Sequence, residues 1–247
     1  MKWSGPGMNG AKMLVLLSTA LLLLILFYIR KEMMLEQKSE KKEYVKLSPY
    51  DDLFREYADT AVCDWMLLAA IAYVESKFDT TSSSQNGAHG IMQIMPSTYR
   101  HLLDEMGVTD TNDYSTRMNI RAASHYIANL DKQFYFINKK ERMNYILGSY
   151  NGGPGRIFDA MRIAKKQGVN RYSWKELTSI LKTMNREEVY TDSLCKCGKF
   201  EAAQTIRYVE KVQRKYKEYK ELELIFHSTN GLEDKKKNIE NEVHNNN

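Results

Sequence analysis

A glutamate at the end of an apolar helical stretch is the residue best placed for acid chemistry. Residues 65–76 read WMLLAAIAYVES. The helical neighbours of Glu75 at three, four and seven residues back are Ala72, Ile71 and Leu68, all apolar. Loss of hydration there favours the neutral carboxyl and raises its pKa, so that it could protonate a sugar oxygen. The alternative is a helix-end glutamate that extends into water, and the pattern alone leaves both open.

The residues that follow the acid form a loop that could bring polar groups beside it. Residues 80–88 are small and polar, TTSSSQNGA, and Ser84 could face the carboxyl or a substrate. A plain flexible loop is the simpler interpretation. Met92 and Gln93 lie between a glycine and Pro96, which predicts a constrained turn. A buried glutamine needs a hydrogen-bond partner, and a sugar group or a backbone group would serve.

A second polar pair stands at a helix terminus. Tyr150 and Asn151 precede a Gly-Gly-Pro-Gly stretch that must end the helix. Residues 148–153 resemble a phosphate-binding loop only superficially, because no strand precedes them and no Lys-Ser/Thr pair follows. The pair is better suited to stack on a sugar and bond its hydroxyl groups.

Helical periodicity dominates the chain, and no stretch shows the alternation of a half-buried strand. The sequence therefore predicts a mainly α fold. The expected helices cover residues 49–61, 65–76, 96–106, 118–136, 142–150, 156–167, 173–181 and 202–219.

The two ends differ from the middle of the chain. Met13–Ile29 is an almost unbroken apolar run flanked by basic residues, with neither a small-residue cleavage site nor a lipidation cysteine after it. Residues 1–31 are therefore expected to form an uncleaved signal anchor or transmembrane helix in preference to a cleaved signal peptide. Residues 32–48 read as a charged tether, helical or disordered, and residues 49–219 as one catalytic domain. Residues 220–247 read as a disordered charged tail.

The charge distribution and the cysteines indicate which ligands and partners the chain could bind. The net charge of +5 is spread along the chain, without the basic stripe of a nucleic-acid-binding protein. A mildly basic surface suits an acidic polymer, although solubility explains it equally well. Cys63, Cys195 and Cys197 have no histidines at ligand spacing, so no metal or cofactor is expected. A disulfide from Cys63 to Cys195 or Cys197 is favoured instead, if the domain is exported.

Three segments in succession resemble a known family. LLAAIAYVESKFD, GAHGIMQIMP and LGSYNGGPGRI are similar to the motifs of the soluble-lytic-transglycosylase (SLT) type of peptidoglycan lytic transglycosylases. The resemblance covers roughly Pro49 to Lys215. It implies a goose-type lysozyme-like helical domain, here behind the N-terminal transmembrane helix.

The resemblance also implies site residues. Glu75 corresponds to the catalytic acid. The expected substrate-binding residues are Ser76, Ser84, Met92, Gln93, Met95, Tyr150, Asn151 and Tyr208. Ser149 replaces an alanine of the third motif, and Gln204 stands where the fourth motif commonly has a glutamate. The role of position 204 therefore stays open.

The activity that the resemblance implies needs only one acid. Glu75 would protonate the oxygen between N-acetylmuramic acid and N-acetylglucosamine, and then deprotonate the C6 hydroxyl that closes a 1,6-anhydro ring. A lysozyme-type hydrolase on the same fold and a catalytically silent glycan-binding or scaffold protein are the alternatives. The expected partners are peptidoglycan strands, the membrane through residues 1–31 and other cell-wall proteins, but no nucleic acid. The expected location is the inner membrane with the domain in the periplasm, or a cleaved, exported form.

Overall fold

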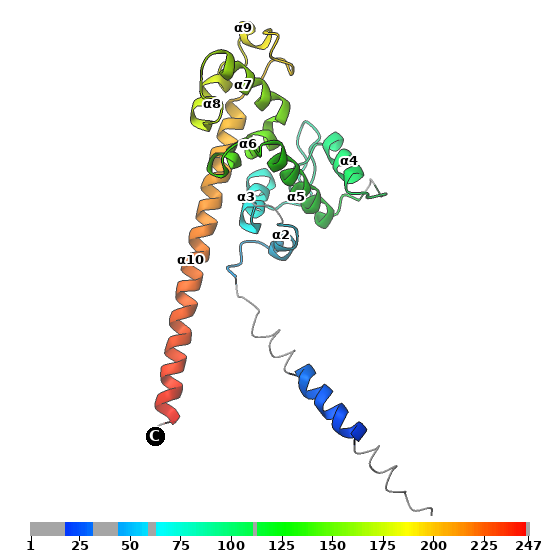
Figure 1. Ribbon diagram of the computed structural model, residues 1–247, viewed down its shortest axis with the longest axis vertical. Helices are drawn as coiled ribbons and strands as arrows, with labels where there is room; N and C mark the ends of the chain where they lie inside the picture. Colours follow the sequence, from blue (N-terminus) through cyan, green and yellow to red (C-terminus); the bar gives the residue numbers. More distant parts are fainter. Residues whose placement is uncertain (1–17, 32–43, 59–62, 111–112, 246–247) are drawn as a thin grey trace, which may run out of the picture. The chain divides into compact units, whose positions relative to one another are not determined.

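The computed structural model describes residues 18–31, 44–58, 63–110 and 113–245, with side chains up to residue 229. The chain divides into two compact units, Met1–Tyr44 and Val45–Asn247. In the first unit, residues 18–31 form a helix, drawn in blue in Figure 1. Within the described residues, no helix combines the length and the apolar character that crossing a membrane requires. The predicted span begins at Met13, and residues 13–17 lie outside the described part, as do residues 32–43 of the predicted tether.

The second unit is helical, as the sequence predicted. Its described residues contain no extended strand, only isolated bridges that join Ser83 to His89 and His89 to Ile94. The helices are α2 (Asp51–Tyr57), α3 (Trp65–Ser76), α4 (Pro96–Glu105), α5 (Thr116–Gln133), α6 (Lys139–Gly152), α7 (Pro154–Lys166), α8 (Trp174–Leu181), α9 (Glu187–Tyr190) and α10 (Ala203–Asn245).

Helix α3 runs through the core because it is apolar on all sides. Its residues 65–72 are all buried, and it packs against α2 and α10. The carboxylate of Asp64 caps the helix by accepting the N–H of Leu67 at 2.9 Å. Its other oxygen accepts the hydroxyl of Tyr216 at 2.8 Å, from α10. One side chain therefore both starts α3 and fixes it against α10.

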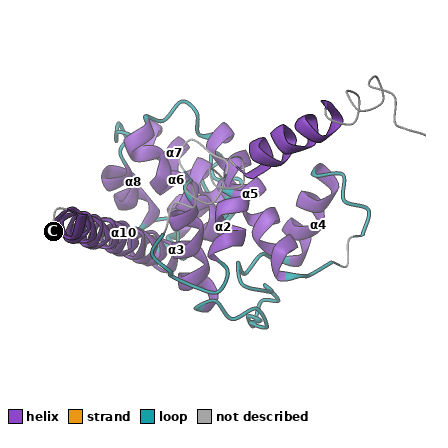
Figure 2. Cartoon of the chain, turned by 90° about the horizontal axis from the view of Figure 1, so that it is seen from below, coloured by secondary structure: helices purple, strands orange, loops and turns teal. Residues whose placement is uncertain are grey.

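Helix α6 is the second centre of the packing. It contacts α5, α7, α8 and α10, which surround it in the view of Figure 2. Gly153, with φ of 87°, separates α6 from α7, and Pro154 opens α7. The predicted bounds of α5 and α6 differ from the observed bounds by two or three residues at each end. Ser115 and Asn138 start these helices earlier, because their side chains accept the N–H groups of Met118 and Glu141.

Helix α10 corrects the prediction of a disordered tail from Lys220. The helix continues without interruption to Asn245, as Figure 1 shows in orange and red. The segment contains no proline and is rich in lysine, glutamate and leucine, which favour helix. Ion pairs one turn apart, Lys217–Glu221 and His227–Glu223, add to this preference. Charge density alone was therefore a poor indicator of disorder here.

The predicted disulfide is also wrong, because no disulfide bond joins Cys63, Cys195 and Cys197 in the described residues. Cys63 lies just before α3, in the core. The other two thiols lie beside α7, where Asp159 accepts the N–H of Cys197 at 2.7 Å and contacts the sulfur of Cys195 at 3.6 Å. The carboxylate of Asp159 thus contacts both cysteines of this pair.

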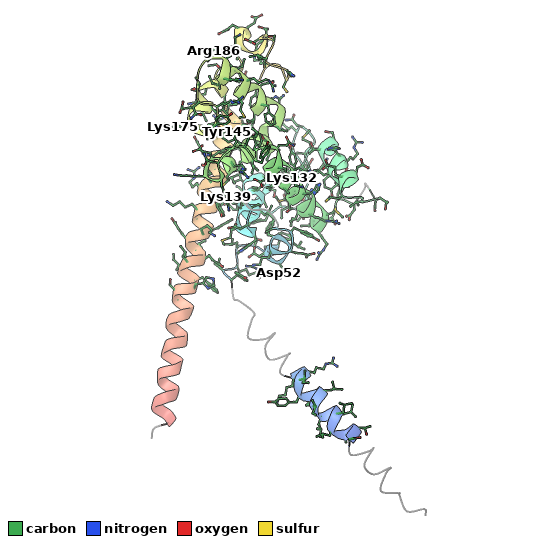
Figure 3. The ribbon with its side chains drawn as sticks, viewed as in Figure 1. Asp52, Lys132, Lys139, Tyr145, Lys175 and Arg186 are labelled. Carbon is green, nitrogen blue, oxygen red and sulfur yellow. The ribbon has the colours of Figure 1, made fainter. Side chains whose placement is uncertain are left out.

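An aromatic cluster fills the space between α6 and α8. Tyr145, labelled in Figure 3, is fully buried, and its ring lies 5.4 Å from that of Trp174 and 5.7 Å from that of Phe134. Its hydroxyl donates to the carbonyl of Arg171 at 2.8 Å. Close approach of Trp174 to α6 is allowed by Gly148, where an added Cβ would lie 2.5 Å from Cη2 of the indole.

We therefore expect Gly148→Ala to lower the free energy of unfolding by about 1–3 kcal/mol, because the methyl group overpacks this contact. Thermal denaturation would measure the loss. Trp174→Phe removes the outer ring of the indole, so Gly148→Ala should cost less in that background. An equal cost in both backgrounds would show that the contact with Trp174 is not the cause.

Candidate active site

Glu75 lies at the C-terminal end of α3 and opens into a groove of about 370 Å³. The groove collects residues from six helices and from the loop between α3 and α4. Its lining consists of Glu75, Ser84, Asn86, Ala88, Gln93, Ile94, Met95, Thr98, Tyr126, Tyr150, Asn151, Gly152, Gly153, Arg156 and Gln204. Among these described residues Glu75 is the only carboxylate, so a single acid faces a wall of amides, hydroxyls and aromatic rings.

Burial favours the neutral form of the Glu75 carboxyl. Loss of hydration raises its pKa from 4.5 to about 7, and the Tyr208 hydroxyl acts in the opposite direction by bonding the charged form. The Tyr208 hydroxyl is buried and makes no hydrogen bond of ordinary geometry with another described residue. Its effect on the pKa of Glu75 places it near the carboxyl, in a contact that substrate binding can tighten. The alternative that Glu75 extends freely into water does not hold.

Tyr150 forms the wall next to the acid. Its hydroxyl donates to the carbonyl of Met92 at 2.8 Å, and its ring lies 5.5 Å from that of Tyr126. Burial and then the neighbouring charge of Glu75 raise the pKa of Tyr150 well above its ordinary value. Tyr150 therefore stays neutral and serves to fix the loop beside the acid.

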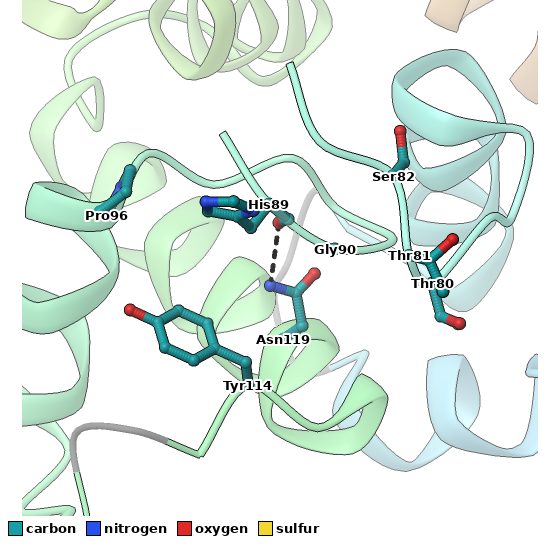
Figure 4. Close-up of a pocket in the computed structure, with 8 residues that line it drawn as sticks. All are labelled: Thr80, Thr81, Ser82, His89, Gly90, Pro96, Tyr114 and Asn119. Carbon is teal, nitrogen blue, oxygen red and sulfur yellow. Dashed lines mark hydrogen bonds between the residues drawn. The ribbon is translucent and has the colours of Figure 1, made fainter. Parts of the chain in front are cut away.

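A side chain from α5 holds the loop between α3 and α4 by hydrogen bonds to the backbone of the loop. Asn119 of α5 is buried; its Oδ1 accepts the N–H of Met92 at 2.9 Å and its Nδ2 donates to the carbonyl of His89 at 3.3 Å. Figure 4 shows the second bond. Gly90 has a φ of 79°, and a Cβ there would lie 2.8 Å from the Asn119 side chain. The glycine is therefore required both by the turn and by this close approach.

Gln93 closes the turn that the sequence predicted. It has a positive φ of 48°, and its Nε2 donates to the carbonyls of Ser82 and Gly90, both at 2.9 Å. The sequence left a sugar group and a backbone group as possible partners of the Gln93 side chain. The structure shows that backbone carbonyls bind its amide nitrogen. Its Oε1 is left for the groove, which Gln93 lines.

A second hollow of about 340 Å³ lies along the same loop (Figure 4). His89, Tyr114 and Asn119 form one side of it and Thr80, Thr81 and Ser82 the other. It contains no carboxylate. The chemistry that Glu75 can perform therefore belongs to the first groove.

The structure brings six of the nine sequence-predicted site residues to the groove: Glu75, Ser84, Gln93, Met95, Tyr150 and Asn151. It places the other three behind the groove wall. The Ser76 hydroxyl donates to the carbonyl of Ile91 at 2.8 Å, the Met92 side chain is fully buried, and Tyr208 is buried against Glu75. These three residues support the groove and do not line it.

The sequence analysis did not predict several groove and loop residues, among them Arg156, Tyr126 and Asn119. Arg156, whose guanidinium lies 5.1 Å from the centre of the Phe200 ring, is the only cation in the described groove lining. Tyr126 adds a second aromatic ring, and Asn119 holds the loop. Asn119 did leave a signal, because it is a polar residue near the start of the apolar stripe of α5, where an unpartnered amide would be costly.

Comparison with known proteins assigns this architecture. Residues 52–173 match the family model of the transglycosylase SLT domain. A relative from Desulfosudis oleivorans, named membrane-bound lytic murein transglycosylase F, is 34% identical over 174 residues, covering 70% of this chain and 37% of that protein. A protein of the same name from Shewanella loihica is 30% identical, with coverages of 69% and 34%. This chain thus spans about a third of the length of the curated relatives it matches.

A likeness also exists among solved structures. The 70 kDa soluble lytic transglycosylase SLT70 from Escherichia coli aligns with a TM-score of 0.48 and 22% identity, over 70% of this chain and 24% of that one. The family match places residues 52–173 of this chain in the transglycosylase SLT domain family. The resemblance noted in the three sequence motifs is thereby confirmed.

The contact between Tyr208 and Glu75 predicts a shift in pH dependence. Tyr208→Phe removes the hydroxyl that lowers the pKa of Glu75, so that pKa should rise further above 7. The alkaline limb of the pH profile of kcat/KM should then move to higher pH, since activity needs the protonated acid. Tyr126→Phe is the matched control, because the Tyr126 hydroxyl does not act on Glu75. An unshifted profile in Tyr208→Phe would contradict the assigned contact.

Proposed function

We propose that this chain is a peptidoglycan lytic transglycosylase. It cleaves the β-1,4 bond between N-acetylmuramic acid and N-acetylglucosamine without consuming water and leaves a 1,6-anhydro end. The observation that carries the proposal is a single carboxyl with a pKa near 7, in a groove that offers no second carboxylate among its described residues. Most glycosidases use two carboxylates, so one acid favours a nucleophile supplied by the substrate.

Glu75 acts first as an acid and then as a base. Its proton passes to the glycosidic oxygen as the bond from that oxygen to C1 breaks. The resulting carboxylate takes the proton of the C6 hydroxyl as that oxygen bonds to C1, which restores the neutral acid. Because the nucleophile belongs to the same sugar, its effective concentration is high. A pKa near 7 suits both steps, since the two protonation states are then close in energy at neutral pH.

Groove side chains have polar atoms suited to holding the sugars. The Thr205 hydroxyl donates to Oδ1 of Asn151 at 2.8 Å, which turns the Asn151 amino group toward an acceptor such as an acetamido oxygen. Oε1 of Gln93 can accept from a sugar hydroxyl, because the nitrogen of this amide is already bonded to the loop. Ser84 supplies a further hydroxyl, and the rings of Tyr126 and Tyr150 supply apolar surface for the faces of the sugars.

A hydrolase on the same fold is the second candidate. It would need a group that positions and deprotonates a water opposite the acid. No carboxylate besides Glu75 lines the described groove, and its one cation, Arg156, cannot act as a base. The transglycosylase is therefore the better supported of the two.

Glu75→Gln should abolish cleavage of purified peptidoglycan, with a loss of about a hundred- to ten-thousandfold, because the amide cannot transfer the proton. Fold and glycan binding should be retained, as circular dichroism and cosedimentation would show. Mass spectrometry of wild-type digests should give muropeptides one water lighter than lysozyme products, without a free reducing end. Hydrated, reducible products would identify a hydrolase. Near-normal activity of Glu75→Gln would refute the role of this residue.

We also propose that residues 1–31 hold the protein in the inner membrane with the catalytic domain in the periplasm. Support comes from the apolar run Met13–Ile29, which lacks a cleavage site, and from the relatives named as membrane-bound. The full-length chain should sediment with membranes and resist extraction by salt, with an N-terminus upstream of Met13. A soluble mature form that begins after Ile29 would identify a cleaved signal peptide instead.

A further inference from the structure

A basic cleft lies between α3 and α10, next to the helix end that carries the acid. It encloses about 280 Å³ and is lined chiefly by Tyr73, Lys77, Lys211, Arg214, Lys215 and Glu218. Four cationic side chains face one carboxylate there. We call these six residues the basic cleft.

Three of the four cations of the basic cleft have no carboxylate partner among the described residues, whereas Lys215 is paired with Glu218. The ammonium of Lys215 lies 4.3 Å from the centre of the Tyr73 ring and 2.7 Å from the carboxylate of Glu218, and its side chain is 19% exposed. In the part of the chain that the structure describes, Lys77, Lys211 and Arg214 form no ion pair or side-chain hydrogen bond. Uncompensated positive charge in a concavity attracts anions, and arginine can bind a carboxylate or a phosphate through two parallel N–H groups.

One face of α10 runs from the active-site groove beside the acid to the basic cleft. Gln204 lines the active-site groove, and Tyr208, one turn later, contacts Glu75. Lys211 and Lys215 continue the same face at seven and eleven residues from Gln204. At a rise of 1.5 Å per residue the cleft begins about 10 Å along α10 from the groove. On α3 it begins at Tyr73, two residues before the acid.

We propose that the basic cleft binds the carboxylates of the short acidic peptides attached to N-acetylmuramic acid, and so selects strands that carry them. The inference rests on the proposed function. The peptide branches from the sugar whose C1 is attacked, and five residues span at most about 17 Å. It can therefore reach the cleft from a sugar bound at Glu75.

The composition of the basic cleft favours a peptide over other anionic ligands. Glu218 can accept hydrogen bonds from the N–H and amino groups that a peptide carries and that a simple phosphate polymer lacks.

Binding, and not cleavage, provides the test. The full-length Glu75→Gln protein, kept in detergent, is cosedimented with insoluble peptidoglycan in two forms: intact, or stripped of peptides by an amidase. Lys211→Glu with Arg214→Glu should weaken binding to the intact form about tenfold, and leave binding to the stripped form nearly as before. Lys182→Glu with Lys217→Glu makes the same change in net charge outside the cleft, and should affect both forms alike. Lys215 is left intact because it packs against Tyr73 and Tyr219.

Three results would overturn the inference. They are undiminished binding in the cleft variant, an equal loss on both forms, and a loss that appears only with vesicles of anionic phospholipid. Undiminished binding would show that the basic cleft does not bind the peptide. An equal loss on both forms would show that the cleft binds the glycan, and a loss only with vesicles would show that it binds lipid headgroups. None of them depends on catalysis. Failure of the wild-type protein to cleave peptidoglycan would refute the proposed function and leave this binding result standing.

Discussion

The burial of one carboxyl group is the constraint on which the site depends. Glu75 ends a helix whose apolar surface runs through the core, and so its carboxyl emerges where water is largely excluded. That environment, and not a charged neighbour, raises its pKa to about 7. Tyr208 from α10 and Tyr150 from α6 close the space around it. Three helices distant in sequence must therefore meet at this point for the acid to remain protonated near neutral pH.

Hydrogen bonds from side chains to the backbone of the loop hold the groove wall in place, in addition to packing. Asn119, Tyr150 and Ser76 each bond a carbonyl or N–H group within residues 89–92, and Gln93 closes the turn from within the loop. These contacts come from α5, α6 and α3, so the loop is tied to the same helices that place the acid. Such a scaffold keeps the groove preorganised for its ligand, which limits the ordering that binding would otherwise require.

Sequence patterns gave the helical class and the position of the acid because both depend on local features. The apolar run before Glu75 and the glycine-bounded turn at Gln93 are readable from neighbouring residues. The directions of Ser76, Met92 and Tyr208 were not readable, because a turn with positive φ and the packing of α10 decide which side chain faces the groove. The extent of α10 and the absence of a disulfide among the described cysteines likewise depend on contacts between segments far apart in sequence. The roles of these residues in substrate binding stay predictions.

The pKa of Glu75 is the most direct test of this account. Glutamate labelled with ¹³C at the side-chain carboxyl, followed by NMR across pH 4 to 9 in the full-length chain, would report it, with Glu75→Gln identifying the resonance. The account predicts a midpoint of about 7. A midpoint near the ordinary value of 4.5 would show that the carboxyl is hydrated and ionised at neutral pH. In that case the single-acid site would lack its proton donor, and the account would be contradicted.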